Sequence, residues 1–532
     1  MAALGTNILS AFIVLKKFAL GPRLLRIYPV PRGPSGRDYE PNNLEFFCDF
    51  LIKSISNAVS LSIYMSPVVL FYMFRKGLMT ASQIMYLSKV FATLGVGVSI
   101  LLIGRGIDRY RNPHYQRFMK ILDEARQDPE FKEQLQAYDF EFFAWLVDFK
   151  WNESSLAPMK YRQSAEKNDD VPFTWKFVQL PLKAFDYFVA HGFARPMIYP
   201  GSVKLLQNAF ADTILKGRAY LIEKNGRRAK VLTEDGNEID TMFLDKRSIE
   251  YNGETLVITC EGNAAFYELG CMVVPRIAGY SILGWNHPGF AGSSGLPYPD
   301  PEKKAVDAVV KYAVTKLGFP LENIIFFAWS IGGYSASYAA MAYPQIKGII
   351  LDATFDNVLP LATARMPSVL LSTVKRVVRD YFPLNVEQQL LRYPGPVRLI
   401  RRFQEEIITT KSFEPATNRG NFLLVNLLRY RYPGIMTEES VNAAWEFLAA
   451  PNFQVQAAVK ERYRYNEEAC ENAIKLATNG QWPTFPCHAG EEWEPEFRCN
   501  VALFLVSKHM DHFDATHNTP LPSSYFRFPW HY

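Results

Sequence analysis

One serine stands where a strand and a helix would meet and where it could act as a nucleophile. Ser330 follows the apolar run Ile324–Trp329 and precedes Gly332 and Gly333. A serine hydroxyl attacks an ester only when a base accepts its proton, so the fold must hold it at a sharp, accessible turn. Such a turn needs small residues two positions before and after the serine. Ala328 and Gly332 meet this need, and we predict Ser330 as a catalytic nucleophile.

Two backbone N–H groups are required to bind the substrate oxygen when it becomes negatively charged. One normally belongs to the residue after the nucleophile, here Ile331. The other comes from a loop after an earlier strand, where Gly262 is followed by Asn263 and Ala264. We expect the N–H of Asn263 or Ala264 to be this donor, and assign Asn263. His287 lies in the next glycine-rich loop, before the nucleophile in the chain, and is expected to shape the loop.

An acid that orients the catalytic histidine is expected in a loop after a later strand. The segment that follows the apolar run near residues 397–401 offers Glu405 first and Glu406 second. Asp352, at the end of the preceding predicted strand, is the alternative acid. We favour Glu405 and keep Asp352 as the competing hypothesis.

The histidine follows the acid in the chain order of this type of site. His517 is favoured because it lies in a loop, in the run Ala-Thr-His-Asn-Thr-Pro, followed in preference by His509 and then His488. His509 and His512 share a predicted helix, residues 500–513, and His531 lies near the terminus. The spacing from His509 to Asp514 matches an acyltransferase pattern, which we interpret as a chance match.

The elements that must position these residues alternate between short apolar strands and helices from about residue 201 to 532. This order predicts a mostly parallel sheet with helices on both faces, the α/β-hydrolase fold. The segment at about 418–500 interrupts the alternation and is predicted to be a cap or helical insertion. The expected strands cover residues 218–223, 228–233, 240–244, 256–260, 281–285, 324–329, 348–351 and 397–401, with a hairpin turn at 235–236 and helices at 301–317 and 333–343.

Two long apolar segments precede this region. Residues 56–74 carry no charge, and residues 84–103 are interrupted only by Lys89. Each is long enough to cross a bilayer, so we predict a transmembrane hairpin within an anchoring region, residues 1–111. Basic residues flank both outer ends, which places both termini on the cytosolic side. Residues 8–15 are expected to lie at the membrane interface without cleavage, and residues 112–200 form a connector to the catalytic domain.

Composition excludes several classes of function. The net charge of +5 is spread over 532 residues without long basic runs, so no nucleic-acid partner is expected. The six cysteines show no metal-ligand spacing, and we expect reduced thiols, no metal and no organic cofactor. The expected partners are a lipid substrate and a membrane; composition does not indicate the oligomeric state.

Several motifs together resemble one known family. The runs CEGNAAFYELGC, GWNHPGFAGSSG, AWSIGG, IRRFQEEIITT and ATHNTPLP, preceded by paired apolar segments, are similar to the α/β-hydrolase domain-containing 16 family. The resemblance implies a membrane-bound lipase of the endoplasmic reticulum that converts phosphatidylserine to lysophosphatidylserine and a fatty acid. Monoacylglycerol is the implied second substrate.

The resemblance places the family's nucleophile on Ser330 and its acid on Glu405, where the family usually has aspartate. Its usual histidine position falls near Gln481, which implies that His488 or a later histidine serves as the base. Two alternatives remain open at this point. The same triad could serve an acyltransferase or a protein depalmitoylase, and a chain without a base would be a membrane scaffold.

Overall fold

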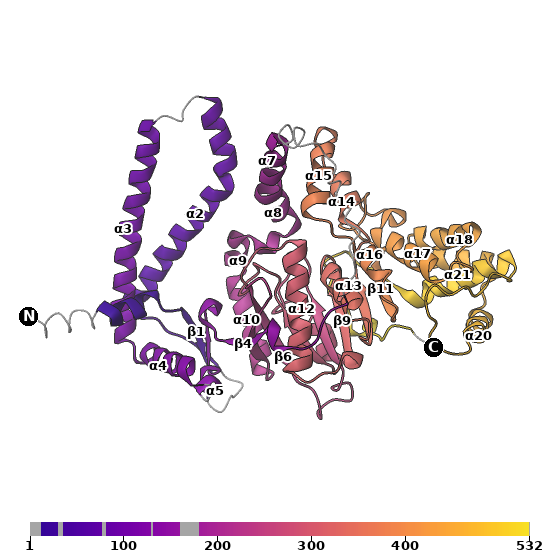
Figure 1. The fold of residues 1–532 in the computed structure, drawn as a ribbon, viewed down its shortest axis with the longest axis horizontal. Coiled ribbons are helices and arrows are strands. Elements are labelled where there is room, and N and C mark those ends of the chain that lie inside the picture. Colours follow the sequence, from indigo (N-terminus) through magenta and orange to yellow (C-terminus); the bar gives the residue numbers. More distant parts are fainter. Residues whose placement is uncertain (1–11, 30–35, 77–80, 129–130, 160–179, 531–532) are drawn as a thin grey trace, which may run out of the picture. The chain divides into compact units, whose positions relative to one another are not determined.

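The computed structural model describes residues 12–29, 36–76, 81–128, 131–159 and 180–530 (Figure 1). The chain forms two compact units. Unit 1 comprises residues 1–146 and 203–225, and unit 2 comprises residues 147–202 and 226–532. The connector expected at 112–200 is therefore divided between the two units, and the segment 203–225 belongs to the first.

Unit 2 is built on a nine-stranded sheet in the order β12-β11-β10-β9-β7-β8-β6-β5-β4. Neighbouring strands from β8 through β7, β9, β10 and β11 to β12 are parallel, whereas β6 is antiparallel to both β5 and β8. The strands are β4 (Val147–Lys150), β5 (Arg227–Leu232), β6 (Glu238–Leu244), β7 (Leu256–Cys260), β8 (Ser281–Trp285), β9 (Ile324–Trp329), β10 (Gly348–Asp352), β11 (Val397–Arg402) and β12 (Met510–Phe513). This arrangement confirms the predicted fold class.

Side chains of the central strands are buried on both faces of the sheet, as expected for strands covered by helices. One face packs against a cluster that includes Val274 of α11 (Val273–Ile277) and Phe526 of the C-terminal segment. Helix α13 (Gly332–Ala342) packs against both α12 (Pro299–Thr315) and α16 (Val386–Leu390) (Figure 1). Helix α13 also packs directly on strands β9 and β10.

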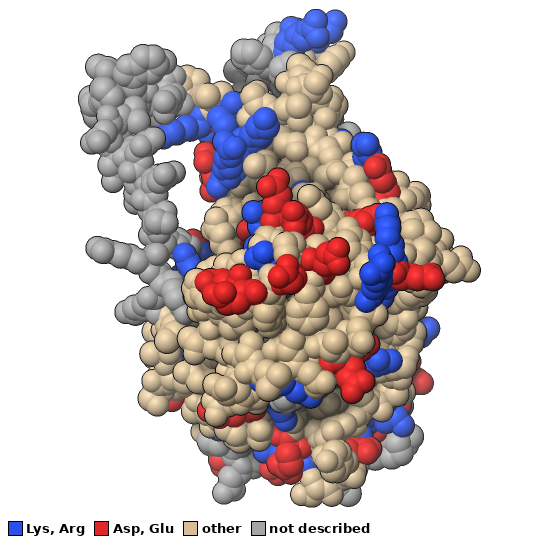
Figure 2. All heavy atoms as spheres, turned by 90° about the vertical axis from the view of Figure 1, so that its right-hand side faces the viewer, with Lys and Arg blue, Asp and Glu red and all other residues tan. Residues whose placement is uncertain are grey.

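The chain between β11 and β12 forms a helical insertion, as the break in alternation predicted. Basic and acidic side chains are interspersed over the face shown in Figure 2, which is typical of a solvated surface. The helices of the insertion are α17 (Arg419–Arg431), α18 (Glu438–Ala449), α19 (Phe453–Arg462), α20 (Glu467–Ala477) and α21 (Pro495–His509). Whether this insertion acts as a cap stays a prediction.

A second insertion, the excursion between β10 and β11, contains helices α14 (Val358–Arg365) and α15 (Leu371–Tyr381). Helix α7 (Leu180–Val189) packs against α15, where Arg376 forms a bidentate ion pair with Asp186 at 2.7 and 2.9 Å. These helices belong to unit 2, although α7 comes from the segment before the predicted catalytic domain.

Unit 1 contains two long helices, α2 (Asn43–Arg75) and α3 (Ala81–Arg111), followed by α4 (Pro113–Gln127) (Figure 1). Within the described residues, one helix, Met85–Arg111, is long and apolar enough to cross a membrane, and only 11% of its most apolar window is buried. The first predicted span, 56–74, lies within α2, but the side chains of 63–71 and 73–74 lie outside the described residues. The hairpin therefore stays a prediction. Of the expected interfacial segment 8–15, residues up to 11 also lie outside the described part.

The remainder of unit 1 is a small folded core. Aromatic side chains such as Tyr115, Phe118 and Phe140 pack together and are fully buried. Its other elements are strands β1 (Leu24–Ile27), β2 (Arg37–Asp38) and β3 (Tyr138–Phe140), and helices α5 (Lys132–Leu135), α9 (Lys204–Ala209) and α10 (Ala211–Glu223).

Two predicted elements are wrong. The expected strand 218–223 is the end of helix α10, because Ile214, Arg218 and Leu221 recur at helical spacing on its buried side. Arg218 is buried there and pairs with Asp139 at 2.9 Å. The expected helix 500–513 ends at His509, because the next four residues form β12 and pair with β11.

Candidate active site

Ser330 occupies a strained turn between β9 and α13. Its φ is +56°, a left-handed conformation that residues other than glycine rarely adopt. Three hydrogen bonds hold it there: its N–H donates to the carbonyl of Asp352 at 2.8 Å, and its own carbonyl accepts from Thr354 Oγ1 at 3.0 Å and from Gly333 N at 3.1 Å. Strained residues of this kind persist only where surrounding contacts fix them, and they cluster at functional sites.

The small residues around the turn are required by close backbone approach. A Cβ atom on Gly332 would lie 2.3 Å from the carbonyl oxygen of Cys260, and one on Gly333 would lie 2.3 Å from Thr354 Cγ2. Ala328, two residues before the serine, is fully buried. The physical reason for the sequence motif is therefore the fit of this turn against β7 and the loop after β10.

The imidazole of His517 lies between Ser330 and Glu405. Its Nε2 is 3.1 Å from Ser330 Oγ, and its Nδ1 is 2.7 Å from Glu405 Oε1. With Nδ1 donating to the carboxylate, Nε2 is free to accept the serine proton. The three side chains come from loops after β9, β11 and β12, which are brought together at one edge of the sheet. Each of the three residues is at most 6% exposed.

Glu405 is fixed by its own loop. Its Oε1 also accepts the N–H of Ile407 at 2.8 Å and of Ile408 at 3.1 Å. Burial by itself raises the pKa of this carboxyl, but the hydrogen bond and charge of His517, together with the two N–H groups, lower it below the ordinary value. Glu405 is therefore held as a carboxylate that faces the imidazole.

Direct hydrogen bonds join the loop after β11, which carries Glu405 (the acid loop), to the loop after β12, which carries His517 (the histidine loop). Glu406 Oε2 accepts the backbone N–H of His517 at 3.0 Å, and the backbone N–H of Gln404 donates to the carbonyl of Ala515 at 3.1 Å. The second acid candidate, Glu406, thus holds the histidine's backbone and does not contact its ring. Consecutive acids in this segment have two different structural roles.

Asp352, the alternative acid, forms an ion pair with Arg402 and is not hydrogen-bonded to His517. The two carboxylate oxygens accept from Arg402 at 3.2 and 2.7 Å. Arg402 Nη1 also donates to the carbonyls of Thr516 at 2.7 Å and Thr519 at 2.5 Å, on either side of His517. Sequence reasoning did not identify Arg402, although an arginine at the end of an apolar strand is a signal, because buried cations require partners.

The other histidine candidates lie away from Ser330. His509 is buried on α21, where its Nδ1 is 2.9 Å from the Leu505 carbonyl, and His512 stacks on Phe403 from strand β12. Burial lowers the pKa of His509 to about 3, so this ring is held neutral. His488 is exposed and pairs with Glu491. Gln481 is also exposed, and His531 lies outside the described residues.

The two backbone N–H groups assigned to the oxyanion remain available. Ile331 immediately precedes α13, and Asn263 lies in the loop after β7. Among the described residues, no acceptor is hydrogen-bonded to the N–H of either residue. A Cβ on Gly262 would lie 2.6 Å from the ring of Trp329, so only glycine allows this loop to approach the nucleophile strand.

His287, which was expected to shape its own glycine-rich loop, bonds to the preceding loop after β7. Its Nε2 donates to the Glu261 carbonyl at 2.9 Å, and its Nδ1 lies 2.7 Å from Glu302 Oε2. Burial alone lowers the pKa of His287, but the charge and hydrogen bond of Glu302 reverse that effect and raise it. The imidazole therefore holds the loop backbone beside the nucleophile without contacting Ser330.

Comparison with known proteins agrees with this architecture. Residues 14–141 match the family model described as phosphatidylserine lipase ABHD16 N-terminal domain, and residues 255–407 match the alpha/beta hydrolase fold. The human and rat proteins named phosphatidylserine lipase ABHD16A are each 42% identical over 96% of this chain and 98% of theirs. An uncharacterised Caenorhabditis elegans protein is 32% identical over 88% of this chain and 90% of its own.

Among solved structures, the Pyrococcus furiosus esterase Pf2001 is similar, with 19% identity, 34% of this chain and 70% of that chain covered, and a TM-score of 0.28. The 42% identity to the human and rat proteins over 96% of this chain confirms the resemblance noted from the motifs. The chain belongs to the ABHD16 family of α/β-hydrolases.

Proposed function

We propose that this protein hydrolyses an acyl ester of phosphatidylserine, releasing lysophosphatidylserine and a fatty acid, with Ser330 as nucleophile, His517 as base and Glu405 as the orienting acid. The observation that supports it best is the continuous hydrogen-bond chain from Ser330 Oγ through both nitrogens of His517 to Glu405. The substrate is inferred from relatives named phosphatidylserine lipase, which match nearly the entire chain.

In the first half of the reaction, Ser330 Oγ attacks the ester carbonyl carbon while its proton passes to His517 Nε2. The tetrahedral intermediate collapses when the protonated imidazole gives that proton to the leaving alkoxide of the lysophospholipid. The acyl group is then bound to Ser330. In the second half, His517 removes a proton from water, which attacks the acyl carbon, and the serine leaves with its proton restored.

The N–H groups of Ile331 and Asn263 bind the oxyanion in both halves. Loss of one such donor typically slows a hydrolase by about a hundred- to a thousandfold. The first N–H is positioned by the turn into α13, and the second by the loop that His287 holds. Both donors are backbone groups on fixed elements, so the site needs no reorganisation as charge develops.

An apolar substrate is supported by exposed apolar side chains in the acid loop and in the segment between β10 and β11. Arg365 of α14 donates to the carbonyls of Glu406 and Ile407, which joins the excursion between β10 and β11 to the loop that carries the acid. Ile407 is 42% exposed, and Val369, in the turn between α14 and α15, is 82% exposed. We propose that these residues contact the acyl chains of the lipid.

Membrane association through helix α3 is part of the proposal, with the endoplasmic reticulum as the compartment and the catalytic unit on the cytosolic side. Its support is the apolar stretch Met85–Arg111, which is largely unburied within the chain. The basic residues Arg105, Arg109 and Arg111 at the end of this helix agree with a cytosolic end.

The decisive experiment replaces Ser330 by alanine in the full-length protein in membranes. Fluorophosphonate labelling and release of lysophosphatidylserine should both disappear, while the protein stays in the membrane fraction. Ser368→Ala, at an exposed serine in the turn before α15, is the matched control and should keep both activities. Retained labelling or turnover in Ser330→Ala would refute the proposal.

The same assay separates the remaining alternatives. Phosphatidylserine, monoacylglycerol and an acylated peptide are offered side by side, because the triad is common to all three reactions. The scaffold hypothesis arose from Gln481 and predicts no turnover of any substrate. Single replacement of His517, His509 and His488 by alanine tests the base, and only His517→Ala should abolish hydrolysis.

A further inference from the structure

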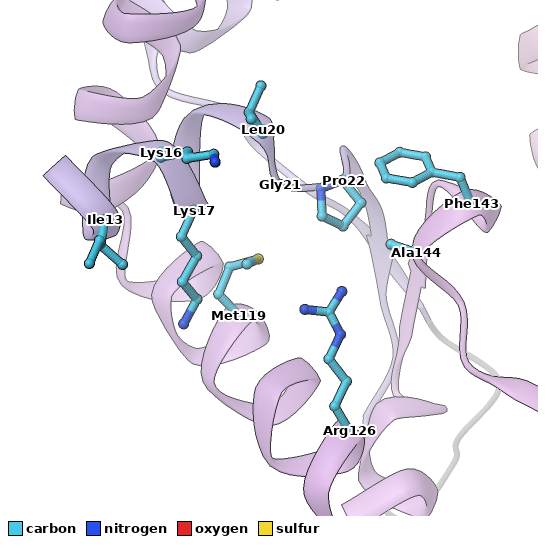
Figure 3. A pocket seen from close by; sticks show the side chains of 10 residues that line it. All are labelled: Ile13, Lys16, Lys17, Leu20, Gly21, Pro22, Met119, Arg126, Phe143 and Ala144. Carbon is cyan, nitrogen blue, oxygen red and sulfur yellow. The ribbon is translucent and has the colours of Figure 1, made fainter.

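A pocket of about 290 Å³ lies within unit 1, remote in sequence from the triad. Figure 3 shows it between the N-terminal helical segment at residues 12–20, helix α4 and the turn Phe142–Ala144. Met119 and Ala144 are buried and form its inner surface. None of the catalytic residues proposed above lines it.

The pocket carries an excess of positive charge. Lys16, Lys17 and Arg126 line it (Figure 3). Asp123 pairs with Lys17 and lies 3.6 Å from Arg126, so this one carboxylate is shared by two of the three cations and the cluster keeps a net positive charge. The neighbouring charges are balanced in pairs, Lys120 with Glu124 and Arg23 with Glu141. The phosphodiester of a glycerophospholipid carries one negative charge and would offset part of this excess.

Apolar side chains surround the cations and remain exposed to the outside. Ile13 is 58% exposed, Leu20 is 52% exposed and Phe143 is 63% exposed, and all three line the pocket. Exposed apolar groups beside lysine and arginine are typical of a segment that lies in the membrane interface. A free phosphate ion would leave these side chains in water, whereas the glycerol backbone and acyl chains of a lipid would cover them.

The pocket is attached to the basic end of the apolar helix α3. Arg105 Nε donates to the carbonyl of Ala19 at 3.1 Å, and a Cβ on Gly106 would lie 2.8 Å from Ala19 Cβ. The N-terminal helical segment is therefore packed against α3 where its apolar stretch ends. If α3 spans the bilayer, the end of its apolar stretch, and the pocket beside it, lie in the headgroup region. Clustered lysine and arginine attract anionic lipids there.

We propose that this pocket binds the phosphate of an anionic glycerophospholipid as a resident lipid, distinct from the lipid that is hydrolysed. Lys16, Lys17 and Arg126 contact the phosphate, and Ile13, Leu20 and Phe143 contact the glycerol and upper acyl chains. The bound lipid fixes the N-terminal helical segment and α4 against the membrane.

The test uses full-length protein carrying Ser330→Ala, so that the probe cannot be consumed at the catalytic site. A photoreactive phosphatidylglycerol is crosslinked to the protein in detergent micelles, and the modified peptides are identified by mass spectrometry. Adducts are expected in residues 12–22 and 113–144. Adducts on the exposed surface of α3 provide an internal measure of correct folding and of non-specific lipid contact.

Replacing Arg126 by glutamine should lower the pocket adducts about fivefold, and the double replacement Lys16→Gln with Arg126→Gln about 25-fold, without changing the adducts on α3. Lys120→Gln removes one positive charge from the same helix outside the pocket and should change nothing. The charge-preserving pair Lys16→Arg with Arg126→Lys should retain the adducts, which separates loss of charge from loss of structure.

Competition identifies the ligand. Unlabelled phosphatidylglycerol should displace the probe from the pocket at far lower concentration than phosphatidylcholine or inorganic phosphate. Equal displacement by phosphatidylcholine, or more effective displacement by inorganic phosphate, would overturn the assignment of an anionic lipid. Equal pocket adducts in the double variant and in Lys120→Gln would also overturn it. Because the readout is confined to unit 1 peptides, it is independent of whether Ser330 hydrolyses phosphatidylserine.

Discussion

Replacing Glu405 by glutamine removes a charge while preserving the shape of the acid loop, and the hydrogen bonds of the carboxylate give the expected size of the effect. Oε1 accepts from His517 Nδ1, Ile407 N and Ile408 N at 2.7, 2.8 and 3.1 Å. Among the described residues, Oε2 is hydrogen-bonded to no partner. Because all three partners of Oε1 are donors, the amide oxygen of glutamine should take that position and its NH₂ group the other.

His517 then keeps its Nδ1–H tautomer, and the loss is confined to the charge that stabilises the imidazolium. A hydrogen bond to a charged group contributes about 1.5 to 3 kcal/mol, which corresponds to a loss in kcat of about 10- to 150-fold. Glu405→Ala removes the orienting partner altogether. Loss of a triad acid's orienting function is expected to lower kcat by about ten thousandfold.

The assay is kcat on phosphatidylserine and on a soluble short-chain ester, with thermal unfolding measured in parallel. The buried amide NH₂ of Glu405→Gln lacks a partner and should destabilise the fold by about 1 to 3 kcal/mol. Glu414→Gln, an exposed position in the same loop, is the matched control and should behave as wild type. Equal loss of kcat in Glu405→Gln and Glu405→Ala would refute the hydrogen-bond assignment at Oε1.

Two further predictions follow from buried charges near the site. Arg402→Met leaves Asp352 without its cation and should destabilise the protein by about 3 to 5 kcal/mol in chemical unfolding and lower kcat. Adding Asp352→Asn should recover part of the stability but not kcat, because the bonds of Arg402 to Thr516 and Thr519 remain absent; recovery of both would contradict the anchoring role. Burial raises the pKa of Glu261 to about 7. Between about pH 5 and 7 the folded state therefore holds a proton that the unfolded state has released. The free energy of unfolding should fall with rising pH in this range, by up to about 1.4 kcal/mol per pH unit. Glu261→Gln should flatten this slope in melting curves across that range, and an unchanged slope would exclude Glu261 as its cause.

Local sequence patterns identified the central strands of the sheet and the nucleophile turn. The apolar run before Ser330 is a buried strand, and the small residues at 328 and 332 fit where the backbone segments approach closely. These features can be predicted from sequence because burial on both faces of a strand requires apolar residues, and close backbone approach requires small ones. The favoured acid, Glu405, and the favoured histidine, His517, were selected on chain order and loop position, and the structure places them beside each other.

Local sequence patterns predicted the wrong secondary structure where a residue's interaction partner lies far away in the sequence. Residues 218–223 have the composition of a strand, but Arg218 pairs with Asp139 from the side of a helix. Similarly, β12 continues an apolar helix without interruption, and it becomes a strand because the edge of β11 offers backbone hydrogen bonds to it.

The sequence by itself therefore determined the fold class, the position of the serine and a short set of acids and histidines. Only the tertiary structure distinguished Asp352, paired with Arg402, from Glu405, and His517 from the buried His509 and His512. The physical reason is that a side chain's chemistry depends on what the sheet register brings within about 3 Å of it. That register aligns β10 with β11 and β11 with β12, and residues paired between β11 and β12, such as Leu399 and Met510, lie more than a hundred positions apart in the chain.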